Sequence, residues 1–247
     1  MSRALLAVLF AAWIPLTMAD ELTVSAAASL SNAFRDIAQA FEQHHPEHRV
    51  ELNFAGSGVL LQQLARGAPV DIFASADQIS MDQAEEQQLL SADSRRDFVS
   101  NRLVLITPAA TQPIHHLDDL LGPAFERIAV SNPASVPVGR YSRDALTELQ
   151  LWQPLQSRII RTQNVRQSLD YVARNEVDAG FVYATDAALI ADKVRMQLEL
   201  PTPEPIRYPV AITAEGAKNP ASALFLDFLF TEPSQAVLSR YGFGLAN

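Results

Sequence analysis

The segment LTVSAAASLSNAFRDIAQAFEQHHPEHRVELNFAGSGVLLQQLARG, residues 22–67, alternates short β-rich runs with amphipathic helical runs. Residues 22–25 predict a strand, and the apolar positions that follow at spacings of three or four predict a helix. Residues 50–54 predict a second strand, and the AGSG turn at 55–58 leads into a second helix that Gly67 ends. Strands that alternate with helices are typical of a mostly parallel sheet covered on both faces.

The first predicted helix carries one continuous apolar stripe. Its members are Leu30, Phe34, Ile37, Ala38 and Phe41. Ser29 or Ser31 is placed to cap its N-terminus, because serine hydroxyls accept from free N–H groups in the first turn. Pro46 stops the helix, since proline cannot continue the hydrogen-bond ladder.

Further along, the same alternation appears twice more. Residues 70–74 and 78–90 predict a strand and a helix, and a second series occupies roughly 103–182. The tail, with a strand at 208–212 and helices at 220–230 and 233–241, is too short for a third domain and is expected to pack on the first series. We therefore expect two α/β lobes, each a mixed, mostly parallel sheet flanked by helices. A two-strand hinge is expected to join the two lobes. The expected boundaries are residues 20–99 with 210–247 for the first lobe and 100–209 for the second.

The N-terminus predicts a secretory signal peptide over residues 1–19. Arg3 precedes an apolar run at 5–16, and small residues follow just before Asp20. Pro15 interrupts the run, which is shorter than the roughly 18 residues that a membrane span needs. The mature protein is thus expected outside the cytoplasm. Because the chain has no cysteine, its stability has to come from hydrophobic cores rather than disulfides.

Composition limits the class of partner. The formal net charge is −9, whereas duplex binding requires clustered Lys and Arg, so a nucleic-acid partner is not expected. An anion bound by so acidic a chain needs local donors, such as backbone N–H groups at helix N-termini.

Five junctions offer such donors at a predicted helix start. They lie at residues 28–30, 56–58, 137–139, 164–166 and 182–184. Ser29 and Ser57 add hydroxyl donors, and Tyr183 adds a phenolic one. A single serine at a helix start is usually only a cap, so the information lies in the coincidence of several. In α/β sheets, ligand sites lie at such strand-to-helix junctions.

Five separated motifs resemble one known family. They are VSAAASL (24–30), FAGSG (54–58), GAPVDIFASAD (67–77), YPVA (208–211) and RYGF (240–243). In this order they resemble the periplasmic molybdate-binding proteins of the molybdenum importers, over essentially the whole mature chain. The resemblance implies a periplasmic-binding-protein fold with the ligand in the cleft between the lobes.

The resemblance also implies a set of uncharged ligand donors. These are the hydroxyl and backbone groups of Ser29 and Ser57, the N–H groups of Val138 and Val165, and the Tyr183 hydroxyl. The implied ligand is molybdate or tungstate, delivered by a monomeric, non-enzymatic protein to the membrane permease of an ABC importer, with no cofactor and no metal cation. The family often has a smaller residue at the position of Val138, which leaves the size preference of this pocket open.

A serine hydrolase is one alternative, with Ser29 or Ser57 as nucleophile. The nucleophile elbow requires Gly-x-Ser-x-Gly, and AGSGV at 55–59 lacks it.

A metal site is a second alternative, because HHPEH at 44–48 has the His-x-x-Glu-His spacing. That motif works on a continuous helix, which Pro46 disfavours. A receptor for another oxyanion such as sulfate, or a sensor rather than a transport protein, is the third.

Overall fold

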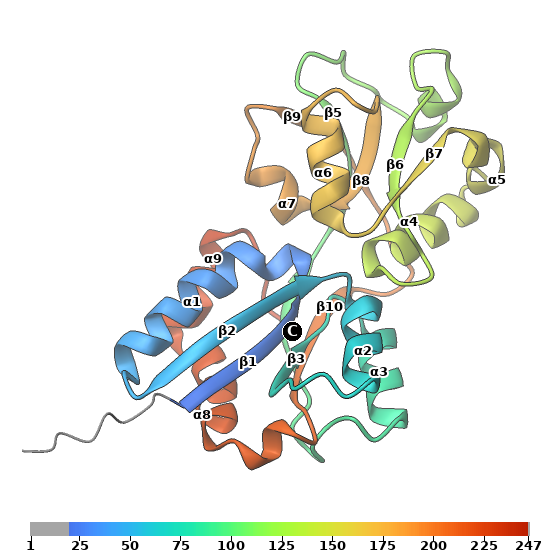
Figure 1. Ribbon diagram of the computed structural model, residues 1–247. Coiled ribbons are helices and arrows are strands. Elements are labelled where there is room, and N and C mark those ends of the chain that lie inside the picture. Colours follow the sequence, from blue (N-terminus) through green and yellow to red (C-terminus); the bar gives the residue numbers. More distant parts are fainter. Residues whose placement is uncertain (1–19, 247) are drawn as a thin grey trace, which may run out of the picture.

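The computed structural model describes residues 20–246, and in them the chain forms two lobes, each built on a five-stranded sheet (Figure 1). Lobe I comprises residues 20–101 and 206–246, and lobe II comprises residues 103–200. The chain passes between them twice, from β4 to β5 and from β9 to β10. The predicted two-lobed α/β architecture is confirmed. The predicted signal peptide lies outside the described residues.

Lobe I contains a mixed sheet with the order β2-β1-β3-β10-β4. Its strands are β1 (Asp20–Ala27), β2 (His48–Ala55), β3 (Ile72–Ala74), β4 (Arg96–Asn101) and β10 (Ile206–Ile212). Strands β2, β1 and β3 are parallel, and β10 runs antiparallel to both of its neighbours. Its helices are η1 (Ala28–Leu30), α1 (Ser31–His44), α2 (Ser57–Ala65), α3 (Gln78–Glu86), η4 (Gly216–Lys218), α8 (Pro220–Leu229) and α9 (Glu232–Arg240). Helices α1, α8 and α9 lie on one side of the sheet and α2 and α3 on the other (Figure 1).

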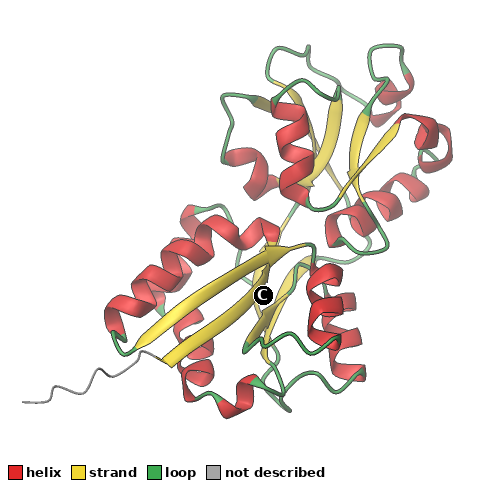
Figure 2. Ribbon diagram, in the orientation of Figure 1, coloured by secondary structure: helices red, strands yellow, loops and turns green. Residues whose placement is uncertain are grey.

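Lobe II repeats this plan, with helices around a second sheet (Figure 2), and its strand order is β7-β6-β8-β5-β9. Its strands are β5 (Leu103–Pro108), β6 (Ile128–Ser131), β7 (Ile159–Thr162), β8 (Ala179–Tyr183) and β9 (Val194–Leu200). Its helices are η2 (Leu117–Leu121), α4 (Pro137–Glu148), α5 (Trp152–Leu155), η3 (Gln156–Arg158), α6 (Val165–Ala173) and α7 (Ala184–Ala188). Strand β5 is antiparallel to β8 and β9, and the other pairs are parallel. Within residues 20–246 no helix is long and apolar enough to span a bilayer.

The local signals in the sequence act as expected at several element ends. The stripe of α1 is buried, with Phe34, Ile37 and Phe41 fully inaccessible to solvent. Helix α1 ends at His44, so the HHPEH segment does not lie on one continuous helix. Among residues 20–246, no group of three or more His, Cys, Asp or Glu side chains could hold a metal ion. Gly67 follows α2 with a φ of 85°, the left-handed conformation that ends helices.

The cap predicted for α1 is wrong. No side chain caps this helix, and its N-cap residue is Leu30. The short helix η1 comes before α1 and shifts the cap position past Ser29, whose hydroxyl faces Tyr208 instead. Strands β4 and β9 and helix α5 were not predicted, whereas the helix start expected at 182–184 is the start of α7. Tyr208 and Pro209, placed in the second lobe by the sequence analysis, pair with β4 in the lobe I sheet.

Candidate functional site

A small cavity lies between the two lobes. Its volume is about 10 Å³, far below the roughly 300–1,000 Å³ of pockets for drug-sized ligands, so it suits a ligand of only a few atoms. Its wall consists of Ala27, Ala28, Ser29, Ala55, Gly56, Ser57 and Ala76 from lobe I and Val136, Pro137, Val138, Asn164, Val165 and Tyr183 from lobe II. The five residues that the resemblance implied are therefore all brought together here.

Three helices begin at the cavity wall. Ser57 is the first residue of α2, Val138 is the second residue of α4, and Val165 is the first residue of α6. Backbone N–H groups in the first turn have no acceptor within their own helix, and they carry partial positive charge. Their convergence makes the cavity an anion site that needs no formal cation.

The cavity wall is uncharged. None of its residues is Asp, Glu, Lys, Arg or His. Polar contacts to a ligand therefore come from neutral groups: backbone amides, the Asn164 side chain and the hydroxyls of Ser29, Ser57 and Tyr183. This chemistry suits an anion that is held by hydrogen bonds, and the lining offers no histidine to act as the base of a serine hydrolase.

The three hydroxyls of the wall differ in their existing partners. Ser57 Oγ accepts from the N–H of Ala76 at 3.0 Å, and Ser29 Oγ lies 3.0 Å from Tyr208 Oη. Tyr183 Oη is buried and has no hydrogen-bond partner among the described residues. Leaving a buried hydroxyl unpaired costs about 1–3 kcal/mol, so this group is poised for a ligand.

The Tyr183 hydroxyl is protonated at neutral pH. Burial is the main cause that raises its pKa well above the ordinary value, and the neighbouring Tyr208 adds to the effect. A phenol that keeps its proton is a donor. The Tyr183 hydroxyl can therefore donate to a ligand in the cavity.

Direct contacts join the two lobes around the cavity. The N–H of Gly58 in lobe I donates to the carbonyl of Ser135 in lobe II at 3.0 Å. Arg166 at the start of α6 donates to the Asn32 side chain at 2.9 Å and to the carbonyl of Ser29 at 3.2 Å. The lobes are thus closed upon each other in this structure.

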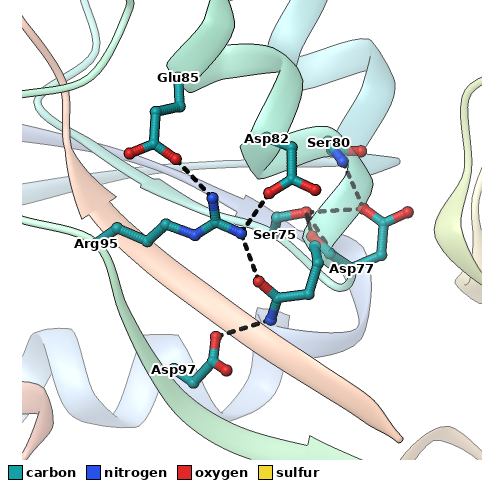
Figure 3. Close-up of polar contacts among 8 residues, drawn as sticks. Ser75, Asp77, Ser80, Asp82, Glu85, Arg95 and Asp97 are labelled. Atoms are coloured by element: carbon teal, nitrogen blue, oxygen red, sulfur yellow. Dashed lines mark hydrogen bonds and ion pairs between the residues drawn. The ribbon is translucent and has the colours of Figure 1, made fainter. Parts of the chain in front are cut away.

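A buried ion pair between Asp77 and Arg140 adds to this closure. Asp77 is the N-cap of α3, and its Oδ1 accepts from Ser75 Oγ and the Ser80 N–H within lobe I (Figure 3). Its Oδ2 accepts from Nε and Nη2 of Arg140 in α4 of lobe II. Arg140 also donates to Ser80 Oγ at 2.8 Å. The two side chains are only 3% and 12% exposed, so closure removes both charges from water.

The start of α3 is itself anchored from outside the cavity. Arg95 donates to Asp82 and Glu85 of this helix and to Gln78, and Gln78 donates to Asp97 (Figure 3). This network holds the helix that presents Asp77. Sequence reasoning identified neither Asp77 nor Arg140 as functional, although the GAPVDIFASAD motif ends at Asp77.

Comparison with known proteins agrees with this geometry. The family model of the bacterial extracellular solute-binding proteins matches residues 22–244. The chain belongs to this family. The molybdate-binding protein ModA of Escherichia coli is 37% identical over 238 residues, which cover 92% of this chain and 90% of that protein. These findings confirm the family resemblance that the five motifs indicated.

Solved structures of solute-binding proteins share the fold. The periplasmic molybdate-binding protein of Azotobacter vinelandii superposes with a TM-score of 0.81 at 27% identity, covering 92% of this chain and all of that one. The sulfate-binding protein SubI of Mycobacterium tuberculosis gives a TM-score of 0.79 at 17% identity, with 92% and 88% covered. The second likeness is one of fold alone, so the fold does not choose the oxyanion.

A second buried ion pair of this solute-binding protein predicts a pH-dependent stability. Arg166 Nε lies 2.7 Å from Asp186 Oδ1, and the Asp186 side chain is fully buried. Burial outweighs the attraction of Arg166 and raises the pKa of Asp186 from 3.8 to about 6. The native carboxyl binds its proton more tightly than the unfolded one, so its contribution to stability is full below pH 3.8 and is lost as pH rises through 6.

Asp186→Asn should remove this pH dependence. Between pH 4 and pH 7.5 we expect the free energy of unfolding of the variant, relative to the wild type, to rise by about 2–3 kcal/mol. Urea unfolding of both proteins at the two pH values measures the change. Parallel pH profiles would show that Asp186 ionises with the same pKa in the folded and unfolded chains.

Proposed function

We propose that this protein captures molybdate, and tungstate nearly as well, in the cavity between its lobes and delivers it to the membrane permease of an ABC importer. The observation that carries the proposal is the uncharged cavity at three helix starts, lined by Ser29, Ser57 and Tyr183, with the Tyr183 hydroxyl buried and unpartnered. The molybdate-binding relatives support the choice of ion.

Neutral donors are sufficient for tight binding of a dianion. A hydrogen bond to a charged group contributes roughly 1.5–3 kcal/mol. We assign such bonds to the hydroxyl and backbone groups of Ser29 and Ser57, the N–H groups of Val138 and Val165, and the Tyr183 hydroxyl. Without a salt bridge to break, the anion also stays releasable to the permease.

The radius and the protonation state of an anion would determine how well these fixed donors bind it. Fixed donors measure the radius of the anion, which separates molybdate and tungstate from the smaller sulfate. They also disfavour a phosphate that carries a proton, because its O–H finds no acceptor. Val138 is 1% exposed and lines the cavity, so its side chain contributes to the size limit.

The proposed setting is the periplasm, reached through a cleaved signal peptide over residues 1–19. We propose that the protein acts there as a monomer and carries its ligand without chemical change. We propose that the two lobes, residues 20–101 with 206–246 and residues 103–200, move relative to each other about the two crossovers between them.

Thermal melting with four anions tests the function. A ligand that binds the native state raises stability by RT ln(1 + [L]/Kd). We expect molybdate and tungstate to raise the Tm at concentrations at which the more weakly bound sulfate and phosphate still leave it unchanged. A shift with sulfate alone would identify a sulfate receptor, and no shift with any of the four would overturn the proposal.

Tyr183→Phe tests the assigned site and should weaken molybdate binding without lowering the stability of the ligand-free protein. Loss of one hydrogen bond to a charged ligand weakens molybdate binding by roughly 10- to 100-fold. The ligand-free protein should not lose stability, because the deleted hydroxyl has no partner in the protein. Calorimetry measures the affinity, and we expect a similar loss for Ser29→Ala.

The matched control is Tyr171→Phe, which deletes a phenol that bonds to Gln167, away from the cavity wall. Unchanged affinity in both Tyr183→Phe and Ser29→Ala would remove these residues from the site.

A further inference from the structure

The hydroxyl of Ser29 has a second polar neighbour behind the cavity wall. Tyr208 Oη lies 3.0 Å from Ser29 Oγ, and either oxygen could be the donor of this bond. Tyr208 belongs to β10, is fully buried and packs edge-on against the ring of Tyr183, but it is not part of the cavity wall. The direction of the Ser29–Tyr208 bond decides whether Ser29 can offer its proton to a ligand.

The direction is set at the crossover between the lobes. The backbone N–H of Arg102 donates to Asn101 Oδ1 at 2.9 Å, and an N–H group can only donate. The side-chain amide of Asn101 is therefore oriented with its NH₂ on the opposite side. That NH₂ donates to Thr185 Oγ1 at 2.9 Å and to Tyr208 Oη at 3.2 Å. Tyr208 Oη is thus the acceptor in its bond with Asn101.

The hydroxyl proton of Tyr208 then still needs an acceptor. Among the hydrogen bonds of the described residues, the partners of Tyr208 Oη are Asn101, which donates, and Ser29. If Ser29 donated to Tyr208, the Tyr208 proton would be buried without an acceptor, which is unfavourable. Tyr208 therefore donates to Ser29 Oγ, and the Ser29 proton is free to point into the cavity.

Ser57 is oriented in the same sense by a separate group. Its Oγ accepts from the N–H of Ala76, which cannot accept in return, so the Ser57 proton is also left for the cavity. Each of the two serines is thus backed by a donor. The hydrogen bond from Ala76 to Ser57 does not involve Tyr208, so the orientation of the Ser57 hydroxyl should stay the same in a Tyr208 variant.

We infer that Tyr208, oriented by Asn101, is a positioning residue that fixes Ser29 as a donor and makes the site select fully deprotonated oxyanions. The inference rests on the proposed function, because it assigns Ser29 to the ligand. An oxyanion without protons accepts from every donor of the cage. A hydrogen phosphate presents an O–H to oriented donors. Ser29 Oγ could accept it through its second lone pair only by turning its own proton away from the ligand, and among the described residues Ser29 Oγ has no hydrogen-bond partner other than Tyr208.

Tyr208→Phe tests the inference by removing the hydroxyl and keeping the ring. Ser29 can then turn its proton toward the space left by the deleted hydroxyl, which leaves both of its lone pairs available to other donors. Sulfate and hydrogen phosphate are the decisive pair of ligands, because they share shape and charge at pH 8.5 and differ in one proton. We expect the preference for sulfate over phosphate, measured by competition against molybdate in calorimetry, to narrow by about tenfold. Molybdate affinity itself should fall by less than that, because Ser29 can still donate.

Two further variants complete the test. Asn101→Leu removes the group that orients Tyr208 while the Tyr208 hydroxyl remains, and it should narrow the same ratio; it keeps the inference testable if Tyr208→Phe does not fold. Tyr171→Phe, the control away from the cavity wall, should leave the ratio unchanged. A wild type that binds molybdate and a folded Tyr208→Phe or Asn101→Leu variant with an unaltered ratio would overturn this inference alone. A wild type that binds none of the anions would overturn the proposed function and this inference with it.

Discussion

Gly58→Ala is expected to remove most of the ligand affinity without destabilising the ligand-free protein. A Cβ atom at Gly58 would lie 2.7 Å from the carbonyl oxygen of Ser135 and 3.0 Å from its Cα, both in lobe II. It would also disturb the Gly58 N–H bond to that carbonyl. Overpacking costs about 1–3 kcal/mol and a lost hydrogen bond about 1 kcal/mol, so we expect the Kd for molybdate to rise on the order of 100-fold.

The clash exists only when the lobes are closed, because the three nearest atoms to the added Cβ all belong to Ser135. In the open protein, alanine in α2 is a better helix former than glycine, by up to about 1 kcal/mol. The Tm of the ligand-free variant should therefore be unchanged or raised.

The matched control is Gln62→Ala, an exposed change on the same helix, which should leave the affinity as it is. Small-angle scattering with and without molybdate would show the wild type contracting and Gly58→Ala contracting less. Wild-type affinity in Gly58→Ala would mean that binding does not require the closed arrangement of α2 against Ser135.

The two strands that escaped sequence reasoning share a place in the fold. Strands β4 and β9 are both sheet edges, each hydrogen-bonded to one neighbouring strand. In β4 only Phe98 and Val99 are buried, and in β9 only its first and last residues are buried. The sequence RDFVSN of β4 has no alternation of apolar and polar residues, so no periodic signal marks it, whereas VRMQLEL of β9 alternates strictly and was detectable from the sequence. The other two edge strands, β2 and β7, were predicted, so edge position alone does not hide a strand. Central strands such as β3, buried throughout, were evident.

The cavity wall was largely predictable because helix starts leave local signals. Gly56-Ser57-Gly58 and Asn164 read as turn and cap residues, and Asn164 does cap α6. Contacts that depend on chain crossing were not predictable: Ser29 and Tyr208 are 179 residues apart, and Asp77 and Arg140 are 63 apart. No sequence periodicity links the two members of such a pair, so their contact becomes evident only in the folded structure. The wrong cap at α1 has the same origin, since Ser29 is used by a distant tyrosine.

Arg140→Met should weaken molybdate binding by on the order of 100- to 1,000-fold. In the closed structure the Asp77 side chain is 3% exposed, and Arg140 provides its interlobe partner. Without Arg140, closure would bury an unpaired carboxylate, and breaking such a pair costs about 3–5 kcal/mol. An open protein avoids this cost by leaving Asp77 hydrated. The penalty should therefore appear in the affinity rather than in the Tm of the ligand-free protein.

The double variant Asp77→Asn/Arg140→Met separates charge from packing. Asparagine is as good an N-cap as aspartate, so α3 should keep its start, and closure of the double variant buries a neutral amide instead of a charge. We expect calorimetry to show that Asp77→Asn recovers at least about tenfold of the affinity lost in Arg140→Met, because the desolvation penalty of a lone carboxylate exceeds that of an amide. If Arg140→Met alone binds molybdate within about threefold of the wild type, the ion pair does not contribute to the closed state. If the double variant is as weak as Arg140→Met, the loss comes from the contacts of Arg140 with Ser80 and the Pro133 carbonyl rather than from the buried charge.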